Sequence, residues 1–91
     1  MENDELSKRA KVFAALSDPA RLRILELVDK REICICKLVP KLALSQPTVS
    51  YHVGLLSTAG LLVTRKEGTN VHCRTKKGVV KCIRQLSGAA Q

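Results

Sequence analysis

The sequence predicts a mainly α-helical fold that carries one small β-hairpin. Apolar residues recur at helical spacing along most of the 91 residues, and the period changes to two only over residues 61–75. Hydrophobic residues make up 45% of the chain, which suffices for a core, and the scarcity of aromatic residues makes that core aliphatic. We expect one domain over residues 1–91, with about five helices, two hairpin strands and little room for an internal ligand cavity.

Three helices are predicted before residue 43. The first begins at Asn3 or Asp4 and ends near Leu16. Asp18 caps the second, which has Pro19 at its first position and ends near residues 29–31. Residues 32–36 (EICIC) form a short extended segment, and a short or irregular third helix follows over residues 37–42, where Pro40 is hard to accommodate. The apolar face of the first helix is formed by Leu6, Ala10, Phe13 and Leu16.

A fourth helix is predicted over residues 45–58. Ser45 is a good N-cap, and Val49, Val53 and Leu56 form a narrow apolar stripe. The opposite face carries short hydrogen-bonding side chains, and His52 is the one residue of this helix that could carry a charge. Such a helix suits the reading of base edges in a major groove, although an ordinary surface helix can have the same pattern. The side chains of this polar face are Gln46, Thr48, Ser50 and Tyr51.

Two strands and a last helix complete the predicted chain. Residues 61–66 and 71–75 alternate as strands and are joined by a glycine-containing turn. A basic hairpin directly after two helices joined by a tight turn is a wing, so the predicted architecture is a winged helix-turn-helix. Val79, Ile83 and Leu86 lie on one face of the last helix, which ends before Gly88.

The net charge of +8 is concentrated in the second part of the chain. Residues 1–36 hold seven basic and seven acidic side chains, whereas residues 37–91 hold nine basic side chains and a single acid, Glu67. Basic residues on both sides of an uncharged helix favour double-stranded DNA as the partner, with solubility as the simpler explanation of the charge. We expect affinity to come from Lys37, Lys41, Arg65, Lys66 and the basic residues nearer the C-terminus.

The chain opens with acidic and then basic residues rather than a signal peptide, and it has no apolar run of membrane-spanning length. These features predict a cytoplasmic protein without a membrane partner. Its four cysteines are therefore expected to be thiols, metal ligands or redox sensors rather than disulfides. A catalytic dyad, a phosphate-binding loop and a Cys-x-x-Cys motif are missing, which argues against an enzyme, a thiol oxidoreductase or a zinc finger.

Cys34 and Cys36 are the strongest chemical signal. In an extended segment their side chains point the same way, and the following helix N-terminus favours thiolates. Two thiolates form half or more of a soft-metal site, although semi-buried cysteines without a ligand role or a site for zinc or another ion remain alternatives. Cys73 is expected to pack in the core and Cys82 at a dimer seam. His72 is expected to point outward, where it is solvated or near phosphate.

Five segments in this order resemble the ArsR/SmtB family of dimeric winged-helix repressors. The segments are SDPARLRIL, EICICKL, LSQPTVSYHVGLL, AGLL and KEGTNVHCR, and together they span most of residues 5–86. The resemblance implies a homodimer that is paired through its first and last helices and binds a near-palindromic operator. It also implies that a metal, a metalloid or an oxidant weakens DNA binding.

The resemblance places DNA contacts on the fourth helix and on the wing. His52 is as well explained as a buried scaffold residue. The implied contacts are Ser45, Gln46, Thr48, Ser50, Tyr51, His52, Arg65, Lys66, Thr69 and Asn70.

The family's sensing motif, Glu-x-Cys-x-Cys-Asp-Leu-Cys, is only partly present. Cys34 and Cys36 match it, but Lys37 replaces the acid and Val39 replaces the third cysteine. Completion of the site would need Cys73, Cys82 or a ligand from the N-terminus of a second copy, which offers only the carboxylates Glu2, Asp4 and Glu5. The expected inducers are As(III), Sb(III), Cd, Pb or Zn, or oxidation of the two thiols, with no obligatory cofactor. The alternative function is a ligand-independent winged-helix regulator or architectural protein with structural cysteines.

Overall fold

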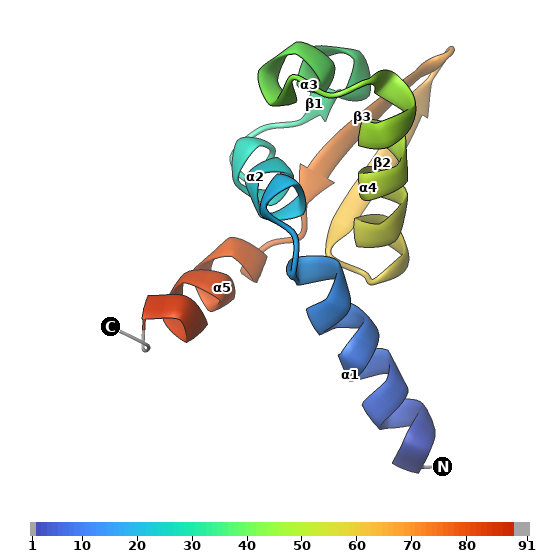
Figure 1. The fold of residues 1–91 in the computed structure, drawn as a ribbon. Helices are drawn as coiled ribbons and strands as arrows, with labels where there is room; N and C mark the ends of the chain where they lie inside the picture. Colours follow the sequence, from blue (N-terminus) through green and yellow to red (C-terminus); the bar gives the residue numbers. More distant parts are fainter. Residues whose placement is uncertain (1, 89–91) are drawn as a thin grey trace.

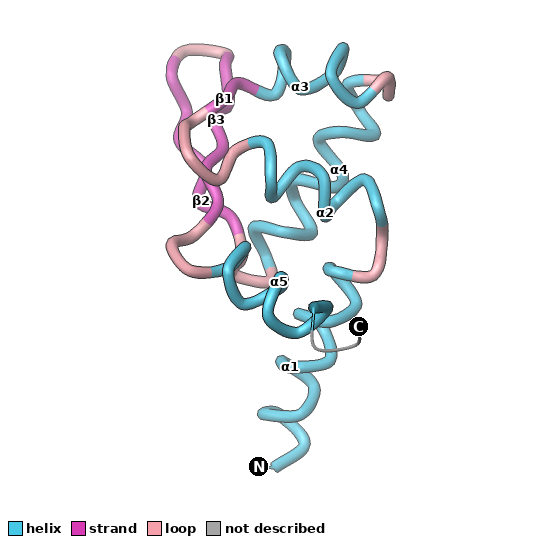
Figure 2. The backbone as a smooth tube through the Cα atoms, turned by 90° about the vertical axis from the view of Figure 1, so that its left-hand side faces the viewer, coloured by secondary structure: helices cyan, strands magenta, loops and turns pink. Residues whose placement is uncertain are grey.

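Helices α2, α3 and α4 pack on one side of a small antiparallel sheet, as the computed structural model of residues 2–88 shows (Figures 1 and 2). The mainly helical fold with a hairpin is confirmed. The helices are α1 (Glu2–Leu16), α2 (Pro19–Leu27), α3 (Ile35–Leu42), α4 (Gln46–Thr58) and α5 (Val79–Gly88). The strands are β1 (Ile33–Cys34), β2 (Leu62–Glu67) and β3 (Asn70–Thr75).

The sheet has three strands in the order β1-β3-β2, one strand more than the predicted hairpin. Strands β2 and β3 pair from Leu62 opposite Thr75 to Glu67 opposite Asn70, and Gly68 takes the left-handed backbone that the tight turn needs (φ 64°). β1 lies on the other side of β3, with Cys34 opposite His72. The segment before α3 is therefore tied to the wing by strand pairing.

The extended segment predicted over residues 32–36 is too long. Only Ile33–Cys34 is a strand, and Ile35 already begins α3. An early helix start buries Ile35 together with Leu38 on one helical face, whereas a longer strand would leave that face incomplete. Pro40 lies inside this eight-residue helix, so its ring removes one internal hydrogen bond.

The predicted capping residues of α2 and α4 are confirmed. An Asp18 carboxylate oxygen accepts from the Ala20 N–H at 2.8 Å, and Ser45 Oγ accepts from the Thr48 N–H at 3.3 Å. Three other helix ends differ: α1 already begins at Glu2, α2 ends at Leu27 rather than near residues 29–31, and α5 includes Gly88. The short turn between α3 and α4 is closed by Ala43 in a left-handed conformation (φ 56°), which is unusual for a residue with a side chain.

The core is formed by one face of α4 together with α2, α3 and the inner side of the sheet. Val49 and Leu56 are fully buried on α4, as are Leu25 on α2 and Leu38 on α3. Cys73 is also fully buried, as predicted. Strand β3 is fastened to α2 by two hydrogen bonds, from Thr75 Oγ1 to the Leu25 carbonyl (2.6 Å) and from the Thr75 N–H to the Val28 carbonyl (3.0 Å).

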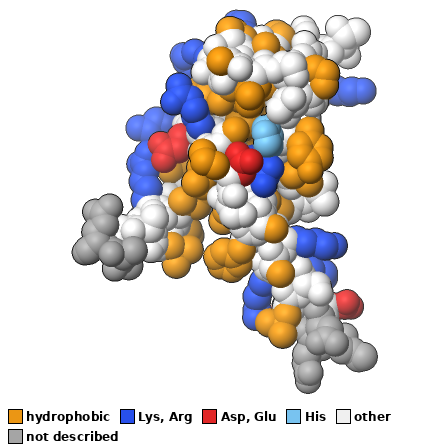
Figure 3. Space-filling model, in the orientation of Figure 1, with side chains coloured by type: hydrophobic (Ala, Val, Ile, Leu, Met, Phe, Trp, Pro, Cys, Tyr) orange, Lys and Arg blue, Asp and Glu red, His pale blue; other side chains and the backbone are white. Residues whose placement is uncertain are grey.

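Helices α1 and α5 project from one end of the molecule, and the N-terminus of α4 and the wing tip lie at the other end (Figure 1). Hydrophobic side chains are visible between the two projecting helices (Figure 3). Phe13 on α1 is 60% exposed and Leu86 on α5 is 64% exposed. None of the helices within residues 2–88 is long and apolar enough to cross a membrane.

The core assignment predicts a large loss of stability on truncation of Leu38. Leu38→Ala leaves a cavity under α4 and is expected to lower the free energy of unfolding by about 2–5 kcal/mol, measured by urea denaturation. Val63→Ala, at an exposed position of β2, is the control and should cost less than about 1 kcal/mol. Equal losses in the two variants would contradict this description of the core.

Candidate nucleic-acid interface and thiol pair

The outward face of α4 is polar and uncharged. Gln46, Ser50 and Tyr51 are exposed, and Tyr51 has 62% of its surface accessible. Ser45 Oγ also donates to Thr48 Oγ1 at 2.9 Å, so the cap and the first turn of the helix share one hydrogen-bonded pair. The buried apolar stripe fixes the rotation of the helix, and the donors and acceptors therefore face solvent as a set.

His52 is a scaffold residue, which corrects its expected role as a DNA contact. Only 9% of its surface is accessible, and its Nδ1 lies 3.0 Å from Arg21 Nη1. The guanidinium can only donate, so Nδ1 is the acceptor in this contact. Arg21 also donates to the carbonyls of Ala15 (2.8 Å) and Ala14 (3.3 Å), so it joins α4 to the last turn of α1.

The wing presents exposed polar and basic side chains, but one of its cations is already paired. Lys66, Thr69 and Asn70 are exposed around the tip. Arg65, in contrast, binds Glu32 with two hydrogen bonds of 2.6 and 3.2 Å and lies 3.7 Å from Glu67. The Arg65 guanidinium holds the pKa of the Glu32 carboxyl below its usual range, and Glu32 raises the pKa of Arg65.

His72 is not solvated as expected, since its side chain is only 21% exposed. β1 pairs beside it on β3, and the sequence did not show that pairing. The buried Nε2 atom of His72 lies 3.3 Å from a Glu67 carboxylate oxygen. This atom makes no hydrogen bond with any group in the described part of the chain.

The two sulfur atoms of Cys34 and Cys36 lie 2.8 Å apart. They meet because Cys34 is the N-cap of α3 and Cys36 lies in its first turn, and not because of the predicted strand alternation. Cys34 is buried and Cys36 is exposed. The Cys36 S–H donates to Cys34, and this bond, together with the N–H groups of Cys36, Lys37 and Val71, lowers the pKa of Cys34.

The same bond raises the pKa of Cys36, because Cys36 would lose its proton beside the Cys34 sulfur. The two pKa shifts have opposite directions, so Cys34 loses its proton more readily than Cys36. The sequence predicted that both thiols would favour the thiolate, whereas in this geometry a second thiolate would lie directly beside the first, and two adjacent like charges repel.

The pair opens into a cavity of about 550 Å³ with a basic wall. Three cations line it, and Glu32 is the one carboxylate among its lining residues. Neither Cys73 nor Cys82 is among the residues that line it. Cys73 is buried in the core, and this burial raises its pKa to about 11. Cys82 is on α5. Within residues 2–88, no group of three or more His, Cys, Asp or Glu side chains could hold a metal ion. The cavity is lined by Arg31, Glu32, Ile33, Cys34, Cys36, Lys37, Lys41, Asn70 and His72.

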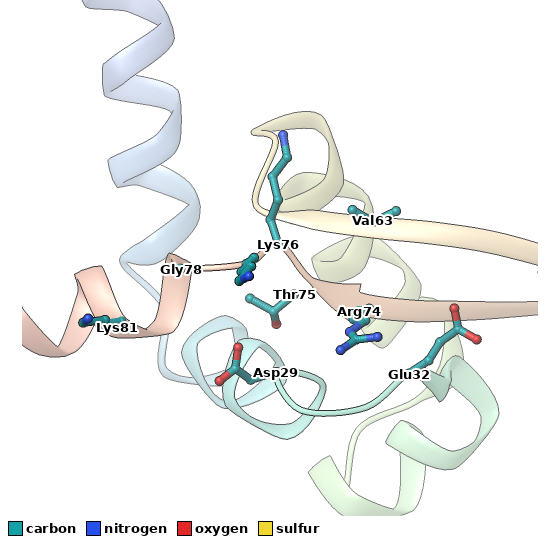
Figure 4. A pocket seen from close by; sticks show the side chains of 9 residues that line it. Asp29, Glu32, Val63, Arg74, Thr75, Lys76, Gly78 and Lys81 are labelled. Atoms are coloured by element: carbon teal, nitrogen blue, oxygen red, sulfur yellow. The ribbon is translucent and has the colours of Figure 1, made fainter.

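A second cavity, of about 770 Å³, lies between β3, the turn after α2 and the start of α5 (Figure 4). It accounts for most of the basic residues near the C-terminus, which were expected around α4. Arg74, Lys76, Lys77 and Lys81 line it, with Asp29 and Glu32 from the opposite side. Glu32 thus lines both cavities, and its position in the sequence did not predict that it would.

The sulfur geometry predicts a titration shift that depends on Cys36. Cys36→Ala removes the S–H donor, so the pKa of Cys34 should rise toward its ordinary value. Thiolate absorption in the ultraviolet, followed against pH, should show its lowest step at higher pH in this variant. Cys82→Ala, which removes an exposed thiol on α5, should leave that step in place. An unmoved step in Cys36→Ala would contradict the assignment of the thiolate to Cys34.

Residues 18–63, which include α2, α3 and α4, match the family described as bacterial regulatory protein, arsR family. The chain is 42% identical over 67 residues to an uncharacterized HTH-type transcriptional regulator of Methanocaldococcus jannaschii, covering 72% of this chain and 75% of the relative. It is 46% identical over 68 residues to the arsenical resistance operon repressor of Staphylococcus xylosus, covering 75% of this chain and 62% of that protein. The chain spans 50–75% of the length of such curated relatives.

Solved structures show the same fold. The homodimeric winged helix-turn-helix DNA-binding domain of a possible ArsR-family regulator from Mycobacterium bovis aligns over 98% of this chain and 82% of its own, with a TM-score of 0.82 and 26% identity. NolR from Sinorhizobium fredii aligns over 97% of this chain and 89% of its own, with a TM-score of 0.81 and 28% identity. The fold is therefore a winged helix-turn-helix, and the family is one of regulatory proteins and not of enzymes. The chain belongs to the ArsR family of bacterial regulatory proteins.

Proposed function

We propose that this protein is a dimeric, sequence-specific DNA-binding repressor that a thiophilic ligand releases from its operator. The observation that carries the proposal is the exposed, uncharged face of α4, a helix whose N-terminus lies at the same end of the molecule as the wing tip (Figure 1). Relatives named as arsenical resistance operon repressors support the repressor role.

We assign base recognition to α4, and phosphate contacts to the wing and α3 beside it. Gln46 can pair with an adenine edge through its amide, and Ser50 and Thr48 can contact bases or phosphates. The Tyr51 hydroxyl can contact a phosphate of the DNA backbone. Lys66, Thr69 and Asn70 of the wing, with Lys37 and Lys41 of α3, supply sequence-independent affinity.

A homodimer paired through α1 and α5 supplies the second recognition helix. An apolar cavity of about 300 Å³ lies between these helices, and Phe13, Leu86 and Cys82 line it. A second copy would remove these side chains from water. The two α4 helices would then contact half-sites about 34 Å apart, one helical turn of DNA. The homodimeric Mycobacterium bovis domain supports a homodimer, without indicating which helices pair.

The inducer is assigned to Cys34 and Cys36. Trivalent arsenic or antimony hydroxide can condense with two thiols: two S–H bonds and two metalloid–hydroxyl bonds break, two metalloid–sulfur bonds form, and two waters leave. The metalloid keeps its oxidation state and its third hydroxyl, so a third cysteine is not required. Arg31, Lys37 and Lys41 in the cavity wall make the soft dications Cd²⁺, Pb²⁺ and Zn²⁺ weaker candidates than an uncharged hydroxide.

Oxidation of the two thiols is a further route to release within the same proposal. The second candidate function is a ligand-independent regulator with structural cysteines. The hydrogen bond between the two sulfur atoms favours it, because that bond provides Cys34 with a partner in the absence of any ligand.

The division of labour between α4 and the wing can be tested with two substitutions. Gln46→Ala should relax sequence preference at one base position by about 1–3 kcal/mol, because it removes a paired base contact. Lys66→Ala should weaken binding to every duplex alike. Affinities measured on specific and random DNA at two salt concentrations separate the two effects, and equal losses on both kinds of DNA in both variants would refute the division.

Ligand release can be tested by titrating the reduced protein, bound to promoter DNA, with arsenite and with cadmium. Arsenite is expected to weaken DNA binding in the wild-type protein and in Cys82→Ser, but not in Cys34→Ser or Cys36→Ser. Cadmium should act only at higher concentration. A wild-type affinity that neither reagent changes would favour the ligand-independent regulator.

A further inference from the structure

Arg65 is the basic residue of the wing whose charge is most completely compensated by nearby carboxylates. Its guanidinium meets both carboxylate oxygens of Glu32, at 2.6 and 3.2 Å, and Glu67 lies 3.7 Å away. Lys66, the next residue, is exposed, and none of the ion pairs given by the described side chains involves it. Two neighbouring basic residues of one strand therefore differ in the charge that they present to a ligand.

The Glu32–Arg65 pair joins segments that are 33 residues apart. The sheet brings them together: Arg65 on β2 and Cys34 on β1 both lie opposite His72 of β3, and Glu32 precedes β1 directly. The pair therefore connects the segment that carries the thiols to the middle of the wing. Glu32 is also the one acid among the residues that line the thiol cavity.

Fold stability does not explain this pair, since both side chains are partly exposed to solvent. Exposed ion pairs contribute little to stability, whereas a fork of two parallel hydrogen bonds fixes the direction of the guanidinium. The Arg84–Glu26 pair is also exposed and has a single hydrogen bond of 3.2 Å, so it offers a comparison on another face.

From these contacts we infer that Glu32 competes with the DNA backbone for Arg65 and thereby limits the affinity of the wing for DNA. A guanidinium fork that faces a carboxylate cannot face a phosphate with the same N–H groups. Binding through Arg65 then requires that the bonds to Glu32 break, whereas Lys66 binds phosphate without such a cost. The inference rests on the proposed DNA binding and adds a residue that sets its strength.

The test uses the full chain and a random-sequence duplex, since a phosphate contact does not depend on sequence. Glu32→Gln should raise affinity by about threefold and steepen the dependence on salt by about one phosphate contact for each wing. Glu26→Gln removes the same charge from the other exposed pair and should change neither quantity by as much. Circular dichroism and thermal unfolding confirm that each variant is folded.

Substitution of Arg65 gives a second arm of the test, in which its effect is compared between the wild-type and Glu32→Gln backgrounds. Arg65→Gln should weaken binding less than Lys66→Gln in the wild-type background, and by about the same factor in the Glu32→Gln background. Equal effects of Glu32→Gln and Glu26→Gln, or an Arg65→Gln loss that is the same in both backgrounds, would overturn the inference. A wild-type protein that binds no DNA at low salt would instead refute the proposed function.

Discussion

Burial of one face of α4 is the constraint on which the functional surface depends. Val49 and Leu56 are fully buried, and Val53 is nearly so, which leaves the helix one possible rotation about its axis. Because that rotation is set from inside, the outer face needs no charged anchor and can consist of short donors and acceptors. In the proposed function, the same packing separates DNA affinity from sequence specificity, since the cations lie on α3 and the wing and not on α4 itself.

Local features of the sequence predicted local structure well. Asp18 and Ser45 act as the N-caps, and the change of period at residue 61 marks the wing, because each of these signals depends on neighbours along the chain. Residues 32–36 were harder: Ile33 and Ile35 are both buried, which fits a strand as well as a helix that begins at Ile35.

The parts that could not be predicted are contacts between distant segments. Arg21 meets His52 across 31 residues, so a histidine on the presumed DNA face turned out to be buried. β1 pairs with β3 and covers His72, although two residues are too short a strand to be recognised from alternation. The two thiols could be identified from their spacing, but their shared proton depends on the geometry of the first turn of α3.

Charge compensation gives the basic half of the chain a finer organisation than its composition suggests. Glu32 lies between two cavities and neutralises one arginine of the wing, and several basic residues near the C-terminus gather around a cavity by the start of α5. Arg65 and Arg84 are held in ion pairs with Glu32 and Glu26, so the proposed phosphate contacts have fewer unpaired arginines to draw on than the composition indicates.

Arg21 sets the angle between α1 and α4. Its guanidinium contacts the last carbonyls of α1 and the ring of His52, so one side chain of α2 fixes the end of α1 to α4. A 15-residue helix is a lever about 22 Å long, and a rotation of about 5° at Arg21 moves its far end by about 2 Å. In the proposed dimer, the same change of angle in both protomers would alter the distance between the two α4 helices, and with it their match to the pitch of a double helix.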